Sequence, residues 1–317
     1  MISKRPEITK RSPERYLRLG ILQTTTDAAT AYRNGPQMSR SEADHAWKEV
    51  TEGLRSFYEL DEKPHFILLP ELALPVGRKG GLISFCKKVG SIIISGIDYT
   101  LDKKAHTVGN QAFVVVPQTW PEFRPSKRCT TFHFGKTYPA PAEMEKLNRF
   151  GYQFKPDQTI WLFDAGAFGR IGICICYDFM DVERYIVYRG EVQHLFVLAY
   201  NRDIQSFYHL AETLSRAVFC NVAVCNTGFH GGSVTVSPFY EPTRRTLYRH
   251  EGKRLFTSQV VHLPVADLMQ AQNGNDLGYL DETGKAERRF KSLPPGYRAR
   301  VTLSSKTVRL NDRGKQS

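Results

Sequence analysis

The sequence lacks the marks of several protein classes. It has no run of about 18 apolar residues, so no transmembrane helix is expected. Its first 20 residues, MISKRPEITKRSPERYLRLG, hold no apolar stretch of the kind found in secretory signals. Cysteine occurs 6 times in 317 residues and never as a C-x-x-C pair, which fits neither a small disulfide framework nor a common zinc motif. We therefore expect no membrane association and a reducing, cytoplasmic environment.

Positive charge is concentrated at the two ends of the chain, which has a net charge of +12. Residues 1–18 hold six Lys or Arg against two Glu, residues 285–317 hold ten against two acidic residues, and the 266 residues between them balance. Such ends could bind nucleic acid or an acidic protein, or serve as solubilising tails, since no aromatic-basic motif accompanies them. We expect a basic arm over 1–17, a folded domain over 18–284 and a basic tail over 285–317.

The pattern of apolar residues predicts strands and helices along most of the chain. Strands are expected over 18–23, 65–70, 91–97, 111–117, 160–166, 170–176, 194–200, 221–226, 231–237 and 259–265. Helices are expected after a capping box at Ser39 and Glu42, and over 80–90, 181–190 and 206–219. Several strands adjacent in sequence favour layered α/β packing over a barrel of strictly alternating strands and helices.

Two cysteines stand two residues apart in the stretch 170–179, RIGICICYDF. Cys174 lies inside the apolar run, where a cysteine commonly packs as a small apolar side chain. Cys176 lies where the run ends, and a strand-to-helix turn can present a nucleophile to a pocket. A zinc site would have to recruit Cys220 and Cys225, whose spacing is irregular. The residues alone leave open a packed pair or one reactive thiol.

Two further segments carry groups that could activate a thiol. A thiol needs a neighbouring base or cation to react as a thiolate at neutral pH. Glu71 in LLPELALP follows an apolar strand and a proline, and Lys136 in HFGKTYPAPAE lies in a loop after Gly135. Each could simply be a solvated charge. Together with Cys176 they would supply a proton acceptor, a cation and a nucleophile.

The motifs PELALP, KTYPAPAE and ICICYD occur in this order, and LSRAVFCNVAVCNTGFHGGSVTVSP follows them. With these motifs and its opening strand RLGILQ, the sequence resembles the nitrilase superfamily of carbon–nitrogen hydrolases over about residues 18–268. The resemblance implies an α/β fold, a four-layer α-β-β-α sandwich. It also implies homodimers or higher homo-oligomers that pack helix layer on helix layer, and no metal or organic cofactor.

The resemblance implies a catalytic triad. Glu71 would be the base, Cys176 the nucleophile and Lys136 an oxyanion donor. The second glutamate of the family would be Glu143 or Glu145, seven or nine residues after the lysine. The implied reaction is hydrolysis of a small-molecule amide, carbamoyl amine or nitrile through a thioester acyl-enzyme.

The resemblance further assigns Tyr177, Tyr138 and Asn201 to the oxyanion and substrate-binding part of the site, with the backbone N–H of Tyr177 as a donor. Tyr138 stands where the family usually has a histidine, and Phe219 stands where many members have a glutamate, with one residue inserted before Asn221. We expect these departures to affect the pocket wall and the substrate class. The alternative is an interaction protein whose nitrilase-like body is recruited by its basic ends to nucleic acid or a partner protein; the complete Glu, Lys and Cys set favours an enzyme.

Overall fold

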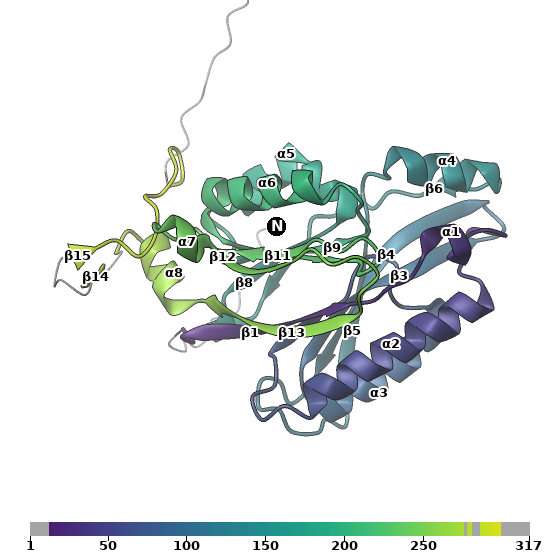
Figure 1. Cartoon of the computed structure of the whole chain (residues 1–317), viewed down its shortest axis with the longest axis horizontal. Coiled ribbons are helices and arrows are strands. Elements are labelled where there is room, and N and C mark those ends of the chain that lie inside the picture. Colours follow the sequence, from purple (N-terminus) through teal and green to yellow (C-terminus); the bar gives the residue numbers. More distant parts are fainter. Residues whose placement is uncertain (1–12, 276–277, 281–285, 299–317) are drawn as a thin grey trace, which may run out of the picture.

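The computed structural model describes residues 13–275, 278–280 and 286–298. Residues 1–12 of the expected basic arm and residues 299–317 of the expected basic tail lie outside the described residues, as do residues 276–277 and 281–285. The described part contains two large sheets that face each other, with helices on the outer face of each (Figure 1). The expected four-layer α-β-β-α sandwich is confirmed.

The first sheet has the strand order β13 (Thr257–Pro264), β1 (Tyr16–Gln23), β2 (Phe66–Leu68), β3 (Ile92–Asp102), β4 (Thr107–Pro117) and β5 (Cys129–Gly135), with β6 (Gln153–Phe154) paired to β4. The second sheet has the order β12 (Thr246–His250), β11 (Ser233–Val236), β10 (Asn221–Asn226), β9 (His194–Ala199), β8 (Arg170–Ile175) and β7 (Leu162–Asp164). A small third sheet pairs β14 (Tyr279–Leu280) with β15 (Ala286–Glu287). Strands β1, β2 and β3 are parallel, as are β8, β9 and β10.

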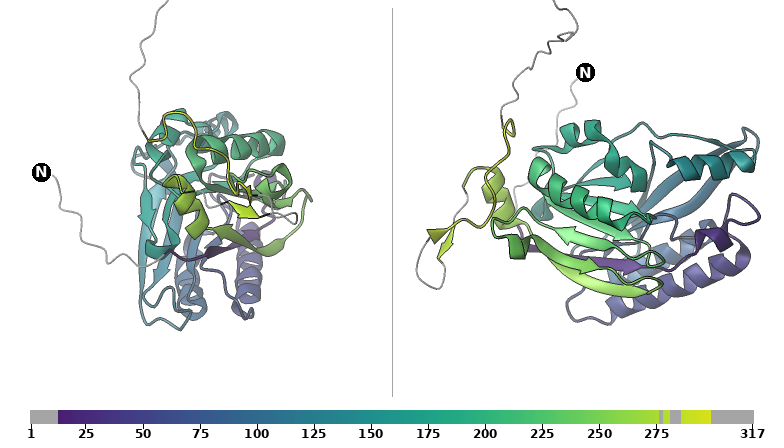
Figure 2. Two further views of the ribbon diagram at one scale, coloured as in Figure 1. Left: turned by 90° about the vertical axis from the view of Figure 1, so that its left-hand side faces the viewer. Right: turned by 45° about the horizontal axis from the view of Figure 1, so that its top comes forward.

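The helices form the two outer layers. Helices α2 (Arg40–Tyr58) and α3 (Lys79–Val89) cover the first sheet, and α5 (Val182–Tyr188) and α6 (Ile204–Leu214) cover the second (Figures 1 and 2). The shorter helices are α1 (Ala28–Ala31), α4 (Pro141–Arg149), α7 (Pro242–Arg245) and α8 (Ala266–Gln272). Single turns occur at Val76–Arg78, Gly166–Phe168 and Cys176–Met180.

Burial explains why these residues form layers. The apolar side chains of one face of the first sheet, such as Ile94 and Val114, pack against Ile173 and Val197 of the second sheet in a single buried cluster. The other face packs against the apolar stripe of α2. Ser39 caps the start of this helix as the motif predicted, because its hydroxyl accepts from the Glu42 N–H at 3.4 Å.

Several element boundaries differ from the expectation. Strand β1 begins at Tyr16 rather than at residue 18, because Tyr16 and Leu17 continue the antiparallel pairing with β13. Helix α6 ends at Leu214, and a π-type turn over Ser215–Phe219 replaces the last part of the expected helix. The Cys220 N–H donates to the carbonyl of Ser215, five residues earlier, at 3.1 Å. A turn of this wider kind ends the helical segment before β10 begins at Asn221.

Candidate active site

The chain turns sharply at Cys176. Strand β8 ends at Ile175, and Cys176 has a φ of +47°, a left-handed conformation that is uncommon for a residue other than glycine. Such local strain recurs where a turn presents a nucleophile. Its thiol lies 3.8 Å from the carbonyl oxygen of Tyr200, at the end of β9. Cys174, inside β8, instead belongs to the buried core, and burial raises the pKa of its thiol against the opposing charge of Arg184 on α5. The two thiols therefore meet different surroundings.

Glu71 follows strand β2 and is buried, with 4% of its surface exposed. Its Oε1 accepts from Lys136 Nζ at 2.8 Å, and its Oε2 accepts from the backbone N–H of Tyr200 at 3.1 Å. Glycine at position 96 allows this placement, because a Cβ there would lie 2.5 Å from the Cα of Glu71. The carboxylate is thus fixed at the point where the two sheets meet.

Lys136 follows strand β5, which the sequence analysis did not predict, and only 1% of its surface is exposed. Its backbone N–H donates to the carbonyl of Asn110 on β4 at 2.8 Å. Its Nζ also lies 2.6 Å from Glu143 Oε2. Of the two candidates for the second glutamate, Glu143 makes this contact, whereas Glu145 is exposed. The ammonium therefore joins two buried carboxylates.

Glu143 is held by helix α4, which the sequence analysis also missed although Pro141 at its first position is a recognised helix-start signal. Glu143 is the third residue of this helix, and its Oε2 accepts from the N–H of Ala140 at 3.1 Å. This contact is the backbone half of a capping box and fixes the carboxylate toward Lys136.

Two neutral residues that the sequence analysis did not identify complete the cluster. Asn110 Nδ2 donates to Glu71 Oε1 at 2.8 Å and to Glu143 Oε1 at 2.7 Å. The hydroxyl of Tyr99, on β3, donates to Glu143 Oε1 at 2.9 Å. Both residues are buried, and the buried carboxylates are therefore hydrogen-bonded on several sides, as buried charge requires.

The electrostatics of the cluster favour an ammonium and a protonated thiol at rest. Burial acts to lower the pKa of Lys136, but the carboxylates of Glu71 and Glu143 outweigh it and hold the pKa well above its usual value. Burial acts to raise the pKa of Glu143, but Lys136 and the hydrogen bonds leave it below its usual value. Burial and then the charge of Glu71 raise the pKa of the Cys176 thiol, and Lys136 opposes them. A thiolate here needs a proton acceptor, and Glu71 is its charged neighbour.

The loop after Lys136 is tied to the turn that carries Cys176. Asp178 Oδ1 accepts from the backbone N–H of Tyr138 at 2.8 Å, and Oδ2 accepts from that of Thr137 at 3.0 Å. Burial raises the pKa of Asp178 to about 6, against the opposing effect of Arg184, which lies 3.5 Å away. Asp178 thereby fixes the lysine loop relative to the cysteine turn.

The three residues expected in the substrate-binding part are placed differently from one another. The side chains of Tyr177 and Tyr138 are 41% and 46% exposed, on the turn and the loop that flank Cys176 and Lys136. The side chain of Asn201 forms a local turn instead, because its Nδ2 donates to the Asp203 carbonyl and its Oδ1 accepts from the Asp203 N–H, both at 3.0 Å. Its backbone N–H donates to Asn226 Oδ1 at 2.8 Å. Asn201 is thus held beside the end of β9 rather than in the carboxylate cluster.

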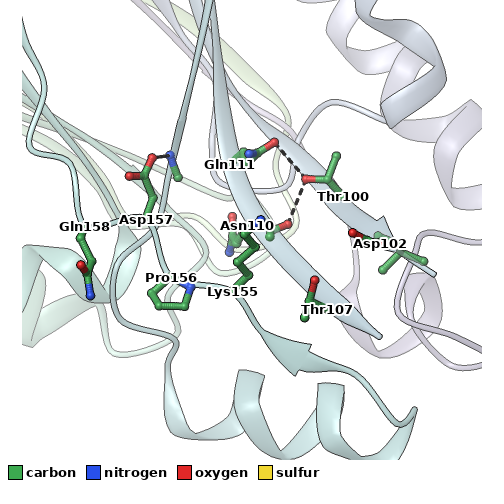
Figure 3. A pocket seen from close by; sticks show the side chains of 12 residues that line it. Thr100, Asp102, Thr107, Asn110, Gln111, Lys155, Pro156, Asp157 and Gln158 are labelled. Carbon is green, nitrogen blue, oxygen red and sulfur yellow. Dashed lines mark hydrogen bonds between the residues drawn. The ribbon is translucent and has the colours of Figure 1, made fainter. Parts of the chain in front are cut away.

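A hollow of about 600 Å³ lies between the ends of β3 and β4 and the segment 155–158 (Figure 3). Its lining is mainly polar and includes Thr100, Gln111 and Asp157. Asn110 is the lining residue that also contacts Glu71 and Glu143. Asn110 therefore lies between the hollow and the carboxylates of the candidate active site.

Neither a metal site nor a membrane-spanning helix is found among the described residues. Within residues 13–275, 278–280 and 286–298, no group of three or more His, Cys, Asp or Glu side chains is arranged to hold a metal ion. None of the helices in the same part of the chain combines the length and the apolar character needed to cross a bilayer.

The fold was compared with those of known proteins. No protein-family model and no curated protein sequence matches the chain. An amidase from Nesterenkonia sp. AN1 is 15% identical, with a TM-score of 0.57, over 80% of this chain and 95% of that one. Nit3 of Saccharomyces cerevisiae, a member of branch 10 of the nitrilase superfamily, is 14% identical, with a TM-score of 0.57, over 86% of this chain and 100% of that one. A CN-hydrolase superfamily protein from Xanthomonas campestris is 12% identical, with a TM-score of 0.55, over 82% of this chain and 95% of that one. Together with its two facing sheets and its two outer helix layers, these similarities show that the chain has the fold of the nitrilase superfamily.

Proposed function

We propose that the protein is a thiol-dependent hydrolase that cleaves a non-peptide carbon–nitrogen bond in a small amide, carbamoyl amine or nitrile. One observation carries the proposal. Lys136 Nζ lies 2.8 Å from Glu71 and 2.6 Å from Glu143, and the Cys176 thiol and the Glu71 carboxylate both contact the backbone of Tyr200, at 3.8 and 3.1 Å. A buried base, cation and nucleophile in one cluster have no need to be so arranged for packing alone, since a buried ion pair is a weak source of stability.

The residue types define the steps for an amide. Glu71 takes the proton of the Cys176 thiol, and the thiolate attacks the carbonyl carbon. The ammonium of Lys136 and the backbone N–H of Tyr177 stabilise the oxyanion, an effect often worth about 3–4 kcal/mol per donor. Protonated Glu71 returns its proton to the departing nitrogen, which leaves as ammonia or an amine, and a thioester remains on Cys176.

The second half of the reaction reuses the same base. Ionised Glu71 takes a proton from water, and the resulting hydroxide attacks the thioester carbon. The carbon–sulfur bond breaks, the acid is released, and the departing thiolate takes the proton back from Glu71. Glu143 does not transfer a proton in this scheme. Its contact with Lys136 keeps the ammonium in place through both halves.

The substrate class rests on the structural relatives. A variant of the Nesterenkonia amidase carries the acetamide moiety of fluoroacetamide on its active-site cysteine. In this chain the exposed rings of Tyr177, next to Cys176, and Tyr138, two residues after Lys136, suit a small substrate that is partly apolar. The cysteines are free, which is compatible with a cytoplasmic protein.

The decisive experiment compares two cysteines that differ by two positions. Ammonia release is measured for the full chain across a panel of amides, carbamoyl amines and nitriles, and then for Cys176→Ala and Cys174→Ala. We expect Cys176→Ala to abolish turnover, and Cys174→Ala to keep it while losing about 1 kcal/mol or less of stability. Glu71→Gln and Lys136→Met should also be inactive and folded. Loss of turnover in folded Cys174→Ala with retention in Cys176→Ala would refute the assignment.

A further inference from the structure

The candidate active site holds more negative than positive charge. Glu71 and Glu143 are buried carboxylates that share the ammonium of Lys136 and the neutral amide of Asn110. Transfer of a proton from Cys176 to Glu71 moves the excess charge to sulfur but does not remove it. Uncompensated charge in a buried site is costly, so a further cation nearby would favour the reactive form.

Lys146 is placed to supply that cation. It lies on α4, three residues after Glu143, and its Nζ donates to the hydroxyl of Tyr99 at 3.2 Å. That hydroxyl in turn donates to Glu143 Oε1 at 2.9 Å. The hydrogen bonds therefore run in one direction, from the ammonium through the phenol to the carboxylate, which polarises each bond in the chain.

Two aromatic rings hold the ammonium of Lys146. Its Nζ lies 4.0 Å from the ring centre of Tyr32 and 4.6 Å from that of Tyr99, within the range of favourable cation–π contacts. The rings meet edge to face at 5.4 Å, and the hydroxyl of Tyr32 donates to Asp98 Oδ1 at 3.0 Å. The ammonium of Lys146 is thus held by specific contacts with Tyr32 and Tyr99 rather than by solvent alone.

The ionisation of Lys146 responds to this environment. Burial lowers its pKa to about 8, against the opposing charges of Glu143, Glu71 and Asp98 and together with that of Lys136. The titratable and charged groups that face it are Glu143, Glu71, Asp98, Lys136, Tyr32 and Tyr99. It is therefore charged at neutral pH and loses its charge in mildly alkaline solution.

We propose that Lys146 is a positioning residue of this site: its ammonium, acting through the Tyr99 hydroxyl, offsets part of the negative charge of Glu71 and Glu143, keeps Glu143 directed at Lys136, and so favours the thiolate of Cys176. The inference rests on the proposed hydrolase function, since it concerns the same thiol. It adds Lys146 to the site as a second cation beside Lys136, connected to Glu143 through the hydroxyl of Tyr99.

The test uses three variants of helix α4 in the full chain. Lys146→Met removes the charge, Lys146→Arg keeps a charge that does not titrate, and Arg149→Met removes an exposed cation from the same helix as a control. Two readouts are taken: the pH profile of kcat/KM for an amide that the wild type hydrolyses, and the rate of Cys176 alkylation by iodoacetamide at pH 7, followed by mass spectrometry. Thermal unfolding establishes that each variant is folded.

We expect wild-type kcat/KM to fall above pH 8, where Lys146 loses its proton. Lys146→Met should alkylate and turn over about tenfold more slowly at pH 7, equivalent to a rise of about one unit in the thiol pKa. Lys146→Arg should stay within a few-fold of the wild type and move the alkaline fall to higher pH. If Lys146→Met does not fold, the pH profile of Lys146→Arg decides.

The proposal is overturned if Lys146→Met matches Arg149→Met in both readouts, or if Lys146→Arg leaves the alkaline fall where it was. Failure of the proposed function looks different. In that case the wild type hydrolyses nothing in the panel and iodoacetamide does not prefer Cys176 to Cys174. If the wild type lacks turnover but Cys176 is preferentially alkylated, the alkylation rates of the variants decide on Lys146.

Discussion

Replacement of Asn110 by leucine tests whether one amide holds the two carboxylates of the site together. Asn110 is 1% exposed, and its Nδ2 donates to Glu71 Oε1 at 2.8 Å and to Glu143 Oε1 at 2.7 Å. Leucine has a similar shape and no hydrogen-bond donor. In Asn110→Leu, both carboxylates would keep their charge and lose the neutral group that separates them.

The size of the effect follows from the partners that stay. A hydrogen bond to a charged group contributes about 1.5–3 kcal/mol. Glu71 Oε1 would keep its contact with Lys136, and Glu143 Oε1 would keep the hydroxyl of Tyr99. The loss is therefore partial, and we expect the free energy of unfolding to fall by about 2–4 kcal/mol. If about 2 kcal/mol of this appears in the transition state, kcat/KM falls about 30-fold.

The assay pairs this variant with its neighbour. Gln111→Leu changes the next residue of β4, which points to the other face of the sheet and accepts from the Thr100 hydroxyl at 3.0 Å. Urea unfolding and kcat/KM for the same amide are measured for both. The reasoning is refuted if Asn110→Leu differs from Gln111→Leu by less than about 0.5 kcal/mol in stability, the range of ordinary surface changes, and by less than about twofold in kcat/KM.

Other perturbations test the surroundings of the site. Burial raises the pKa of Asp178 to about 6, and its protonated carboxyl would release the loop after Lys136, so kcat/KM should fall as the pH drops through 6. If Asp178→Asn shows the same fall in kcat/KM below pH 6, another group is responsible for it. Val182 on α5 is 70% exposed, and a second copy of the chain that packs on this helix layer would cover it. In sedimentation, Val182→Glu should then be a monomer where the wild type is a dimer, with an unchanged Tm. A monomeric wild type would contradict the dimer. Deletion of residues 1–12 leaves β1, which begins at Tyr16, and should keep turnover within a few-fold; loss of turnover in a folded deletion protein would show that the basic arm reaches the active site.

The strands that carry Glu71 and Cys176 could be predicted because they lie inside the protein. Both faces of β2 and β8 are covered, so each appears in the sequence as a continuous apolar run with a polar residue at its end. Strand β5, which Lys136 follows, is an edge strand, and its sequence CTTFHFG has mixed polarity because only one of its seven residues, Phe134, is buried. The position of Lys136 therefore depended on the family resemblance rather than on the apolar pattern.

The roles of Asn110 and Tyr99 could not be predicted from spacing. The pairing of β3 with β4 shifts register between Ile97 and Thr100, so alternation counted from the apolar part of β3 no longer indicates the face of the sheet to which a side chain points beyond that position. Tyr99 lies within the shift. A signal did exist for Asn110, which is a polar residue directly before the expected strand QAFVVVP, but it does not reveal the two carboxylates as partners.

The two departures from the motifs of the resembled family, Phe219 and Tyr138, lie in different parts of the structure. Phe219 was expected to alter the pocket wall, but it ends the π-type turn with a φ of +60° and lies 5.9 Å, ring centre to ring centre, from Tyr297. It also shares a buried cluster with Leu268 and Phe290. Phe219 therefore packs against the C-terminal segment and does not line the cluster of Glu71, Lys136 and Cys176. Tyr138 is the departure that lies beside the candidate site. Its backbone N–H donates to Asp178, which follows the candidate active-site residue Cys176 by two positions. Differences in substrate class should therefore be sought at Tyr138 first.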